Sequence, residues 1–161
     1  MVSIAQLSKL PVYYRKTIPS DYLDVMGHMN VRWYMTLFDE AAWQFFNSFG
    51  MDRTYYKNTR NGAFALKHFI RYLAEVHAGE TVAVRIRVLG RSAKRVHFMH
   101  FLINETTGSV ATTMEALGSH ADLTARRTSP FPDSIATALD GLIAKQNNLG
   151  WNAPLCGVIQ P

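Results

Sequence analysis

The sequence predicts an α+β fold in which an antiparallel sheet packs against one long buried helix. In the segment Val31–Phe49, apolar residues recur at helical spacing over a wide face. Four later segments are rich in Val, Ile, Phe and Tyr and are joined by short turns, which favours an antiparallel meander. With 161 residues, the chain is expected to form one domain over residues 1–161, with a core of about 12–135 and a C-terminal extension over 136–161.

The expected elements follow in the order strand, long helix, four strands, terminal helix. Val12–Ile18 is β-branched and aromatic and lies between two prolines, which is typical of a strand. The long helix has Asn30 where an N-cap belongs and Gly50 where a C-cap glycine belongs. The four later strands and the short C-terminal helix are expected over Ala63–Val76, Thr81–Leu89, Arg95–Asn104, Ser109–Leu123 and Asp133–Lys145.

Composition excludes several classes of protein. Apolar residues make up 48% of the chain and charged residues 18%, which is too apolar for a disordered protein. The single cysteine excludes a disulfide framework and a CxxC zinc site. His97 and His100, three residues apart on a strand, face opposite sides, so no metal site is expected. No apolar run has the length of a membrane span or signal peptide, and a cytoplasmic location is expected.

The chain is basic, with 17 Lys and Arg residues against 12 Asp and Glu residues and a net charge of +5. Such a surplus attracts anionic ligands, and nucleic acid, anionic lipid and phosphorylated cofactors all fit it. The charges occur singly and in pairs rather than in a long block, which disfavours a nucleic-acid-binding arm.

The polar loop before the long helix is the strongest candidate for chemistry. The sequence has no GxSxG elbow and no glycine-rich nucleotide motif, whereas Asp21, Asp24, Gly27, His28 and Asn30 crowd against the expected helix start. The free N–H groups of a helix N-terminus suit an oxyanion, and a carboxylate beside them can act as nucleophile or general base. The same residues also fit a loop that only caps a helix.

The stretch DYLDVMGHMNVRWYMTLFDEA resembles the signature of hotdog-fold acyl-CoA thioesterases of the 4-hydroxybenzoyl-CoA thioesterase-like group. Their usual pattern is D-x-D-x-x-G-H-V-N-N, followed by a tyrosine and a helix with small residues. The similarity continues through FALKHFIRYLAEVHAGETVAVRIRV and GRSAKR to DLTARRTSPFP, about residues 12–135. It implies a hotdog fold, which is an antiparallel β-sheet wrapped around one long central α-helix, and hydrolysis of an acyl-CoA to a free carboxylic acid and CoA. No cofactor is implied, because coenzyme A is part of the substrate.

The resemblance implies catalytic roles for residues of the loop. It identifies Asp24 as the catalytic carboxylate and the backbone N–H of Val31 as the oxyanion donor. It implies that Gly27 lets the chain approach the thioester, that His28 positions the loop or the thioester, and that Asn30 caps the helix. Whether Asp24 attacks the carbonyl or activates water stays open.

Two departures from the family pattern bear on the substrate class. Val31 replaces the second asparagine of the pattern, and Asp21 lies six rather than five residues before the motif glycine. Neither departure affects the position of the main carboxylate, so the expected reaction is unchanged while the acyl group stays open.

The resemblance also implies where the substrate binds. In similar proteins, two basic loops hold the phosphates of CoA, and the corresponding residues here are Arg91, Lys94, Arg95, Arg126 and Arg127. Solvated basic turns are the alternative. The helix aromatics Trp33, Tyr34 and Phe38 are candidates for the acyl site, although core or subunit interface is the commoner place for such rings. Several rings there would favour an aromatic acyl group or a quaternary ammonium group.

An exposed sheet edge is a liability in a monomer, and similar proteins pair edge to edge and build the active site across the seam. A homodimer or a homotetramer of such dimers is therefore expected, with an acyl-CoA substrate and no nucleic-acid or membrane partner. Two other functions fit the sequence: a non-catalytic acyl-CoA or acyl-lipid binding module of the same fold and, less well, a basic nucleic-acid-binding domain.

Overall fold

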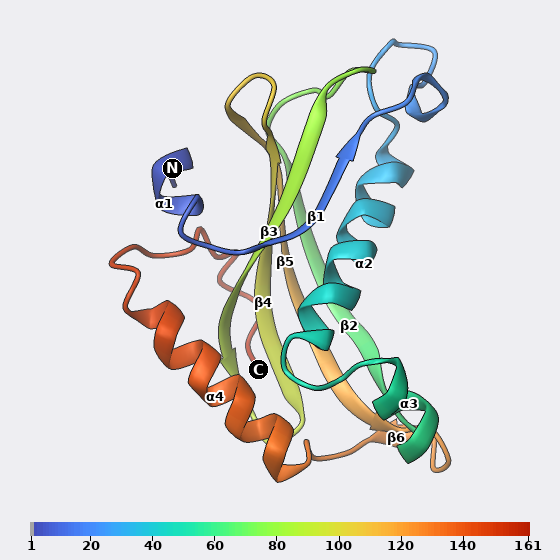
Figure 1. Ribbon diagram of the computed structural model, residues 1–161, viewed down its shortest axis with the longest axis vertical. Coiled ribbons are helices and arrows are strands. Elements are labelled where there is room, and N and C mark those ends of the chain that lie inside the picture. The colour runs from blue at the N-terminus through green and yellow to red at the C-terminus, as the bar shows by residue number, and fades with distance from the viewer. Residues whose placement is uncertain (1) are drawn as a thin grey trace.

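A computed structural model describes residues 2–161 as a curled antiparallel sheet wrapped around one long helix (Figure 1). The elements in chain order are α1 (Ile4–Leu7), β1 (Val12–Thr17), the 3-10 helix η1 (Ser20–Tyr22), α2 (Val31–Asn47), α3 (Arg53–Thr59), β2 (Asn61–Tyr72), β3 (Thr81–Arg91), β4 (Arg95–Asn104), β5 (Ser109–Asp122), β6 (Arg127–Thr128) and α4 (Asp133–Asn147). The predicted fold class is confirmed. Within residues 2–161, no helix is both long and apolar enough to cross a membrane.

The strand order of the sheet corrects one expectation. The order is β1-β3-β4-β5-β2, with every neighbouring pair antiparallel and β6 added beside β5. Strands β3, β4 and β5 form the predicted meander, but β2 pairs with β5 at the far edge instead of continuing it. Residues 73–80 join β2 to β3 across three strand spacings, about 14 Å. Eight extended residues reach about 26 Å, so this connection is long enough.

The alternation of side chains along the strands creates two cores. On β4, Phe98 and Leu102 face α2 and join the main core, whereas Met99, Phe101 and Ile103 face the opposite side. On β3, Val82, Val84, Ile86 and Val88 join the main core with α2. The sheet therefore has an inner face covered by α2 and an outer face covered by other segments.

The C-terminal extension covers the charged residues of the outer face. Arg87 is only 7% exposed, because its guanidinium lies 4.2 Å from the centre of the Trp151 ring and donates to the Trp151 carbonyl oxygen. His97 pairs with Glu115 at 2.8 Å, and the other Glu115 oxygen accepts the N–H of Cys156. These contacts explain how a sheet face that carries charges becomes buried.

The predicted N-cap of α2 is confirmed, whereas its predicted C-cap lies beyond the observed one. Asn30 is the N-cap, and its Oδ1 accepts the N–H of Arg32 at 3.2 Å. Helix α2 ends at Asn47 with Ser48 as C-cap, so Gly50, with a φ of +98°, lies beyond the cap. The short elements α1, η1, α3 and β6 were not predicted, because one or two turns of helix, or two residues of strand, are too short to show periodicity.

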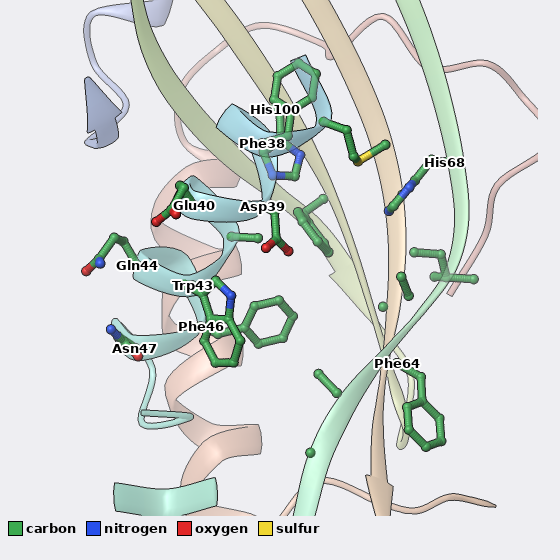
Figure 2. A pocket seen from close by; sticks show the side chains of 18 of the residues that line it. Phe38, Asp39, Glu40, Trp43, Gln44, Phe46, Asn47, Phe64, His68 and His100 are labelled. Carbon is green, nitrogen blue, oxygen red and sulfur yellow. The ribbon is translucent and has the colours of Figure 1, made fainter. Parts of the chain in front are cut away.

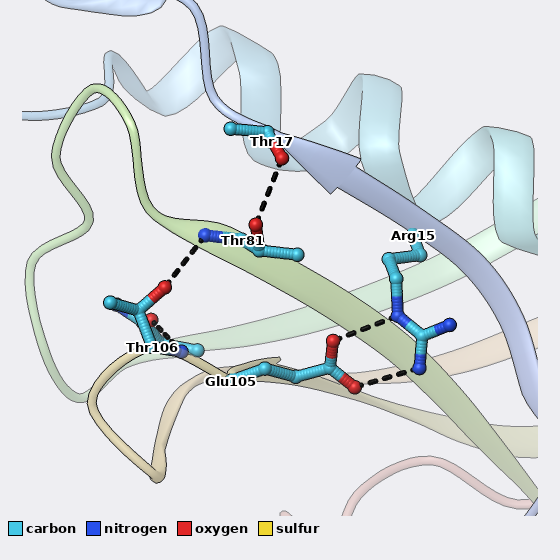
Figure 3. Close-up of polar contacts among 6 residues, drawn as sticks. Arg15, Thr17, Thr81, Glu105 and Thr106 are labelled. Atoms are coloured by element: carbon cyan, nitrogen blue, oxygen red, sulfur yellow. Dashed lines mark hydrogen bonds and ion pairs between the residues drawn. The ribbon is translucent and has the colours of Figure 1, made fainter.

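Polar contacts fix β1, the strand that leads into the predicted catalytic loop (Figure 3). The Arg15 guanidinium makes two hydrogen bonds to Glu105, at 2.8 and 2.9 Å. The hydroxyls of Thr17 and Thr81 lie 2.8 Å apart, and the Thr81 N–H donates to the Thr106 hydroxyl at 2.9 Å. These contacts tie the end of β1 to β3 and to the β4–β5 turn, so the loop starts from a fixed point.

Candidate active site

The loop between η1 and α2 folds into a tight turn around the predicted catalytic carboxylate. Asp24 Oδ1 accepts the N–H of Met26 at 2.9 Å, and the Gly27 N–H donates to the Asp24 carbonyl oxygen at 3.0 Å. The Asp24 N–H donates in turn to the His28 carbonyl oxygen. Gly27 has a φ of +86°, a conformation that favours glycine. The turn therefore requires the motif glycine and fixes the carboxylate by its first oxygen.

The second carboxylate oxygen of Asp24 faces His28. Asp24 Oδ2 lies 3.7 Å from His28 Nδ1, and the two side chains are 15% and 26% exposed. The carboxylate is thus sheltered but accessible, and in the described chain Oδ2 has no hydrogen bond. This leaves one oxygen free to act on a ligand.

The first turn of α2 directly follows this loop in the chain, and its first N–H has no partner in the part of the chain described. The Asn30 side chain accepts the N–H of Arg32, and the Asn30 carbonyl oxygen accepts the N–H of Trp33. The N–H of Val31 meets no acceptor among residues 2–161. The positive end of the helix dipole adds to the attraction of this N–H for an oxyanion.

Neighbouring segments support the loop, and this support was not predicted. His77 Nδ1 donates to the Gly27 carbonyl oxygen at 3.1 Å, and the N–H of Met29 donates to the Val76 carbonyl oxygen at 2.7 Å. The Trp33 ring stacks on the Tyr22 ring, with centroids 3.8 Å apart. His77 lies in a turn far along the sequence, and no local pattern marks it as a neighbour of Gly27.

A cavity of about 800 Å³ lies between α2 and the edge strand β2 (Figure 2). Phe38, Trp43 and Phe46 line it from α2, and Phe64 and Phe98 line it from the sheet. Of the residues predicted for the substrate, Phe38 lines this cavity. Trp33 and Tyr34 do not. Tyr34 is buried against Tyr72, and this burial raises the pKa of its hydroxyl to about 12.

Several polar side chains also line the cavity, and the sequence analysis gave none of them a binding role. Asp39 comes from α2, His68 from β2 and His100 from β4. Asp39 follows Met35 by four residues on a helix face that also carries Phe46. A carboxylate on an otherwise apolar helix face was the available signal.

In the folded molecule, the predicted CoA-binding residues lie at the opposite end of α2 from Asp24. The turn with Lys94 and Arg95 packs on the end of β5, where the His120 N–H donates to the Lys94 carbonyl oxygen. The second basic turn lies at the same end, because Arg127 of β6 is opposite Asp122 of β5 in the strand register. Helix α2 runs between the two ends over 17 residues, about 26 Å. The two basic turns are therefore brought together, but away from the Asp24 of the same chain.

Two members of the basic group have specific contacts. Arg91 makes a two-point ion pair with Asp140 of α4, with its Nε 2.7 Å from Oδ1, and this contact raises the pKa of the guanidinium. Arg126 has a φ of 53°, and its guanidinium lies 5.7 Å from the centre of the Phe64 ring. Arg91 therefore helps to attach α4, whereas Lys94, Arg95, Arg126 and Arg127 are exposed.

Comparisons with known proteins support a common family. The chain is 34% identical over 125 residues to an Agrobacterium fabrum protein named L-carnitine dehydrogenase/betainyl-CoA thioesterase, and the match covers 78% of this chain and 25% of that protein. It is 25% identical to a betainyl-CoA thioesterase of Pseudomonas aeruginosa, over 84% of this chain and 86% of the relative. The chain thus spans about a quarter of the length of the first relative and most of the second.

A solved structure and a family model agree with these relatives. A Staphylococcus aureus protein solved in complex with CoA superimposes with a TM-score of 0.79 and 24% identity, covering 91% of this chain and 96% of that one, which shows the fold. The model of the thioesterase-like superfamily matches residues 18–139, which include the Asp24 loop, α2 and the whole meander. The chain therefore belongs to the thioesterase-like superfamily, and its curled sheet around α2 is the hotdog fold of that family.

Proposed function

We propose that this protein hydrolyses the thioester bond of an acyl-CoA, releasing a free carboxylic acid and CoA. The proposal rests on two groups of one short segment. One is a sheltered carboxylate oxygen, Asp24 Oδ2, and the other is the Val31 N–H at the start of α2, which has no partner among residues 2–161. Thioester hydrolysis needs these two groups, one to deliver an oxygen nucleophile and one to stabilise the negative charge that develops on the carbonyl oxygen.

The chemistry follows from these two groups. The thioester carbonyl oxygen accepts a hydrogen bond from the Val31 N–H while Asp24 either removes a proton from an attacking water or attacks the carbonyl carbon itself. In both routes the C–S bond breaks, CoA leaves as the thiolate and takes up a proton, and one water is consumed. His28, 3.7 Å from the carboxylate, and Asn30, which caps the helix, hold the two groups in place.

We further propose that two copies of the chain form one active site. Strand β2 is an edge strand of 12 residues, and Leu66, Phe69 and Tyr72 on it are exposed. Antiparallel pairing of β2 with a second copy would cover this edge. It would also bring the basic end of one chain toward the Asp24 end of the other, which supports a role for the basic turns in holding the CoA phosphates.

The acyl group that best fits the proposal is short. Two relatives bear the name betainyl-CoA thioesterase, and a betainyl group ends in a quaternary ammonium. The aromatic rings of the cavity suit such a cation. We therefore propose a compact acyl group with a positive charge.

A panel of acyl-CoAs with a thiol reagent tests this function. The purified protein is expected to release free thiol from at least one short acyl-CoA, with one carboxylic acid formed for each thiol. Betainyl-CoA, acetyl-CoA, 4-hydroxybenzoyl-CoA and palmitoyl-CoA cover the acyl classes. Binding of an acyl-CoA in calorimetry without thiol release from any member would instead identify a binding module.

A further inference from the structure

The cavity between α2 and β2 has a polar end (Figure 2). There the Asp39 carboxylate points into the cavity, with His68 opposite it on β2 and His100 beneath Phe38. Glu40, Gln44 and Asn47 also line the cavity from α2. Arg53 lines the cavity from α3, and aromatic rings such as Phe38, Trp43 and Phe46 form much of the remaining wall.

His100 indicates that this end is built for a ligand. It is 1% exposed, its ring packs 5.1 Å from Phe38 and 5.2 Å from Phe98, and neither ring nitrogen has a hydrogen-bond partner in the described chain. A buried polar group without a partner costs free energy. A polar ligand, or a water that accompanies it, would supply the partner that the protein does not.

Asp39 has no cationic partner among the described residues that line the cavity. Arg53 also lines the cavity but forms no ion pair with Asp39. Burial lowers the pKa of His100 to about 3, so this ring is neutral at pH 7. Burial also lowers the pKa of His68, although the neighbouring Asp39 opposes the shift. Neither ring therefore supplies the positive charge that would pair with the carboxylate.

We propose that Asp39 is a specificity-determining residue that pairs with a positive charge on the acyl group, an inference that rests on the thioesterase function proposed above. A cation in the cavity meets the carboxylate on one side and the faces of aromatic rings, including Trp43 and Phe46, on the other. A neutral acyl group of the same shape strips water from Asp39 and offers no partner, which is costly. The protein thus selects the acyl group by its charge as well as by its size.

The position of Asp39 on α2 limits the length of that acyl group. Asp39 follows Val31 by eight residues, about 12 Å along the helix axis. Side chains of a helix lean toward its N-terminus, so the carboxylate lies nearer to Val31 than its Cα does. A charge only a few bonds from the thioester carbonyl therefore lies within reach of Asp39 while the carbonyl oxygen meets the Val31 N–H.

Two substrates that differ only in charge test this inference. Betainyl-CoA carries a trimethylammonium group, and 3,3-dimethylbutanoyl-CoA carries a tert-butyl group of the same shape. We expect kcat/KM to favour the betainyl substrate by at least about 10-fold, because the neutral isostere leaves Asp39 unpaired. Asp39→Asn is expected to reduce that preference to near unity, and Asp39→Glu to keep most of it.

The controls separate this inference from the proposed function. Asp133→Asn removes an exposed carboxylate at the start of α4 that does not line the cavity, and is expected to keep the wild-type preference. Equal kcat/KM for both substrates in the unmodified protein, or a preference that survives Asp39→Asn, would overturn the role of Asp39 while leaving the thioesterase function intact. Failure to release thiol from any acyl-CoA in the panel would count against the function itself.

Discussion

Asp24→Asn is expected to lower kcat by about 100-fold or more, because the amide can neither attack the thioester nor take a proton from water. The amide oxygen can still accept the N–H of Met26, the bond that fixes the turn, so the fold and acyl-CoA binding are expected to persist. Thiol release at saturating substrate measures kcat, and a thermal melting curve checks the fold.

Asp21→Asn is the matched control for this prediction. Asp21 lies in η1, three residues before Asp24, and its side chain is exposed. Removal of its charge is expected to change kcat by only a few-fold. Full activity in Asp24→Asn, or an equal loss in both variants, would show that the reaction does not depend on the Asp24 carboxylate.

The double substitution Leu66→Lys with Phe69→Lys on β2 is expected to produce a monomer with on the order of 100-fold lower kcat/KM. Both side chains are 41% exposed, so the change should not unfold the single chain. Lysines on an edge strand oppose pairing with a second edge. Without the second copy, the basic turns that would hold CoA are missing and the thioester is badly placed, which is costly in rate.

A second exposed apolar residue provides the control. Val158, 73% exposed, lies in the C-terminal segment and not on β2. Val158→Lys is expected to keep both dimer and activity. Sedimentation measures the assembly of each variant. A β2 variant that is monomeric yet fully active would contradict the two-chain site.

The sequence predicts the elements of this fold well where their patterns are long. Helix α2 begins at the predicted residue because Asn30 is a strong N-cap, and β4 spans the residues expected of it. The partner of β2 could not be predicted in the same way. The apolar pattern of a strand shows which side chains are buried, but not which strand lies beside it, and here an eight-residue connection carries the chain across the sheet.

The candidate site divides in the same manner. The contacts within the Asp24 loop join residues that are close in the sequence, so the turn and the helix cap can be predicted from adjacent residues. The cavity depends on contacts between distant segments: Asp39, His68 and His100 come from three elements. The spacing of these residues in the sequence does not predict that they lie together. The alternation of side chains along a strand predicts only that His97 and His100 face opposite sides of β4.

The central claim, that Asp24 of one chain acts on a thioester whose CoA is held by the basic end of a second chain, has a direct test in mixed dimers. One variant is Asp24→Asn, and the other reverses the basic turns by Lys94→Glu, Arg95→Glu, Arg126→Glu and Arg127→Glu. Each variant alone is expected to be nearly inactive with substrate below KM, and melting curves check that both are folded. When the two variants carry different tags and are co-expressed in equal amounts, random association makes about half of the dimers mixed.

Each site of a dimer takes Asp24 from one chain and the basic turns from the other. In a mixed dimer, one site therefore has both an intact Asp24 and intact basic turns, and the other site has neither. Activity is therefore expected to return to about a quarter of that of the unmodified protein, since half of the dimers each regain one of two sites. Purified mixed dimers that remain as inactive as the parent variants would contradict the account, because the carboxylate and the basic turns would then have to act within one chain.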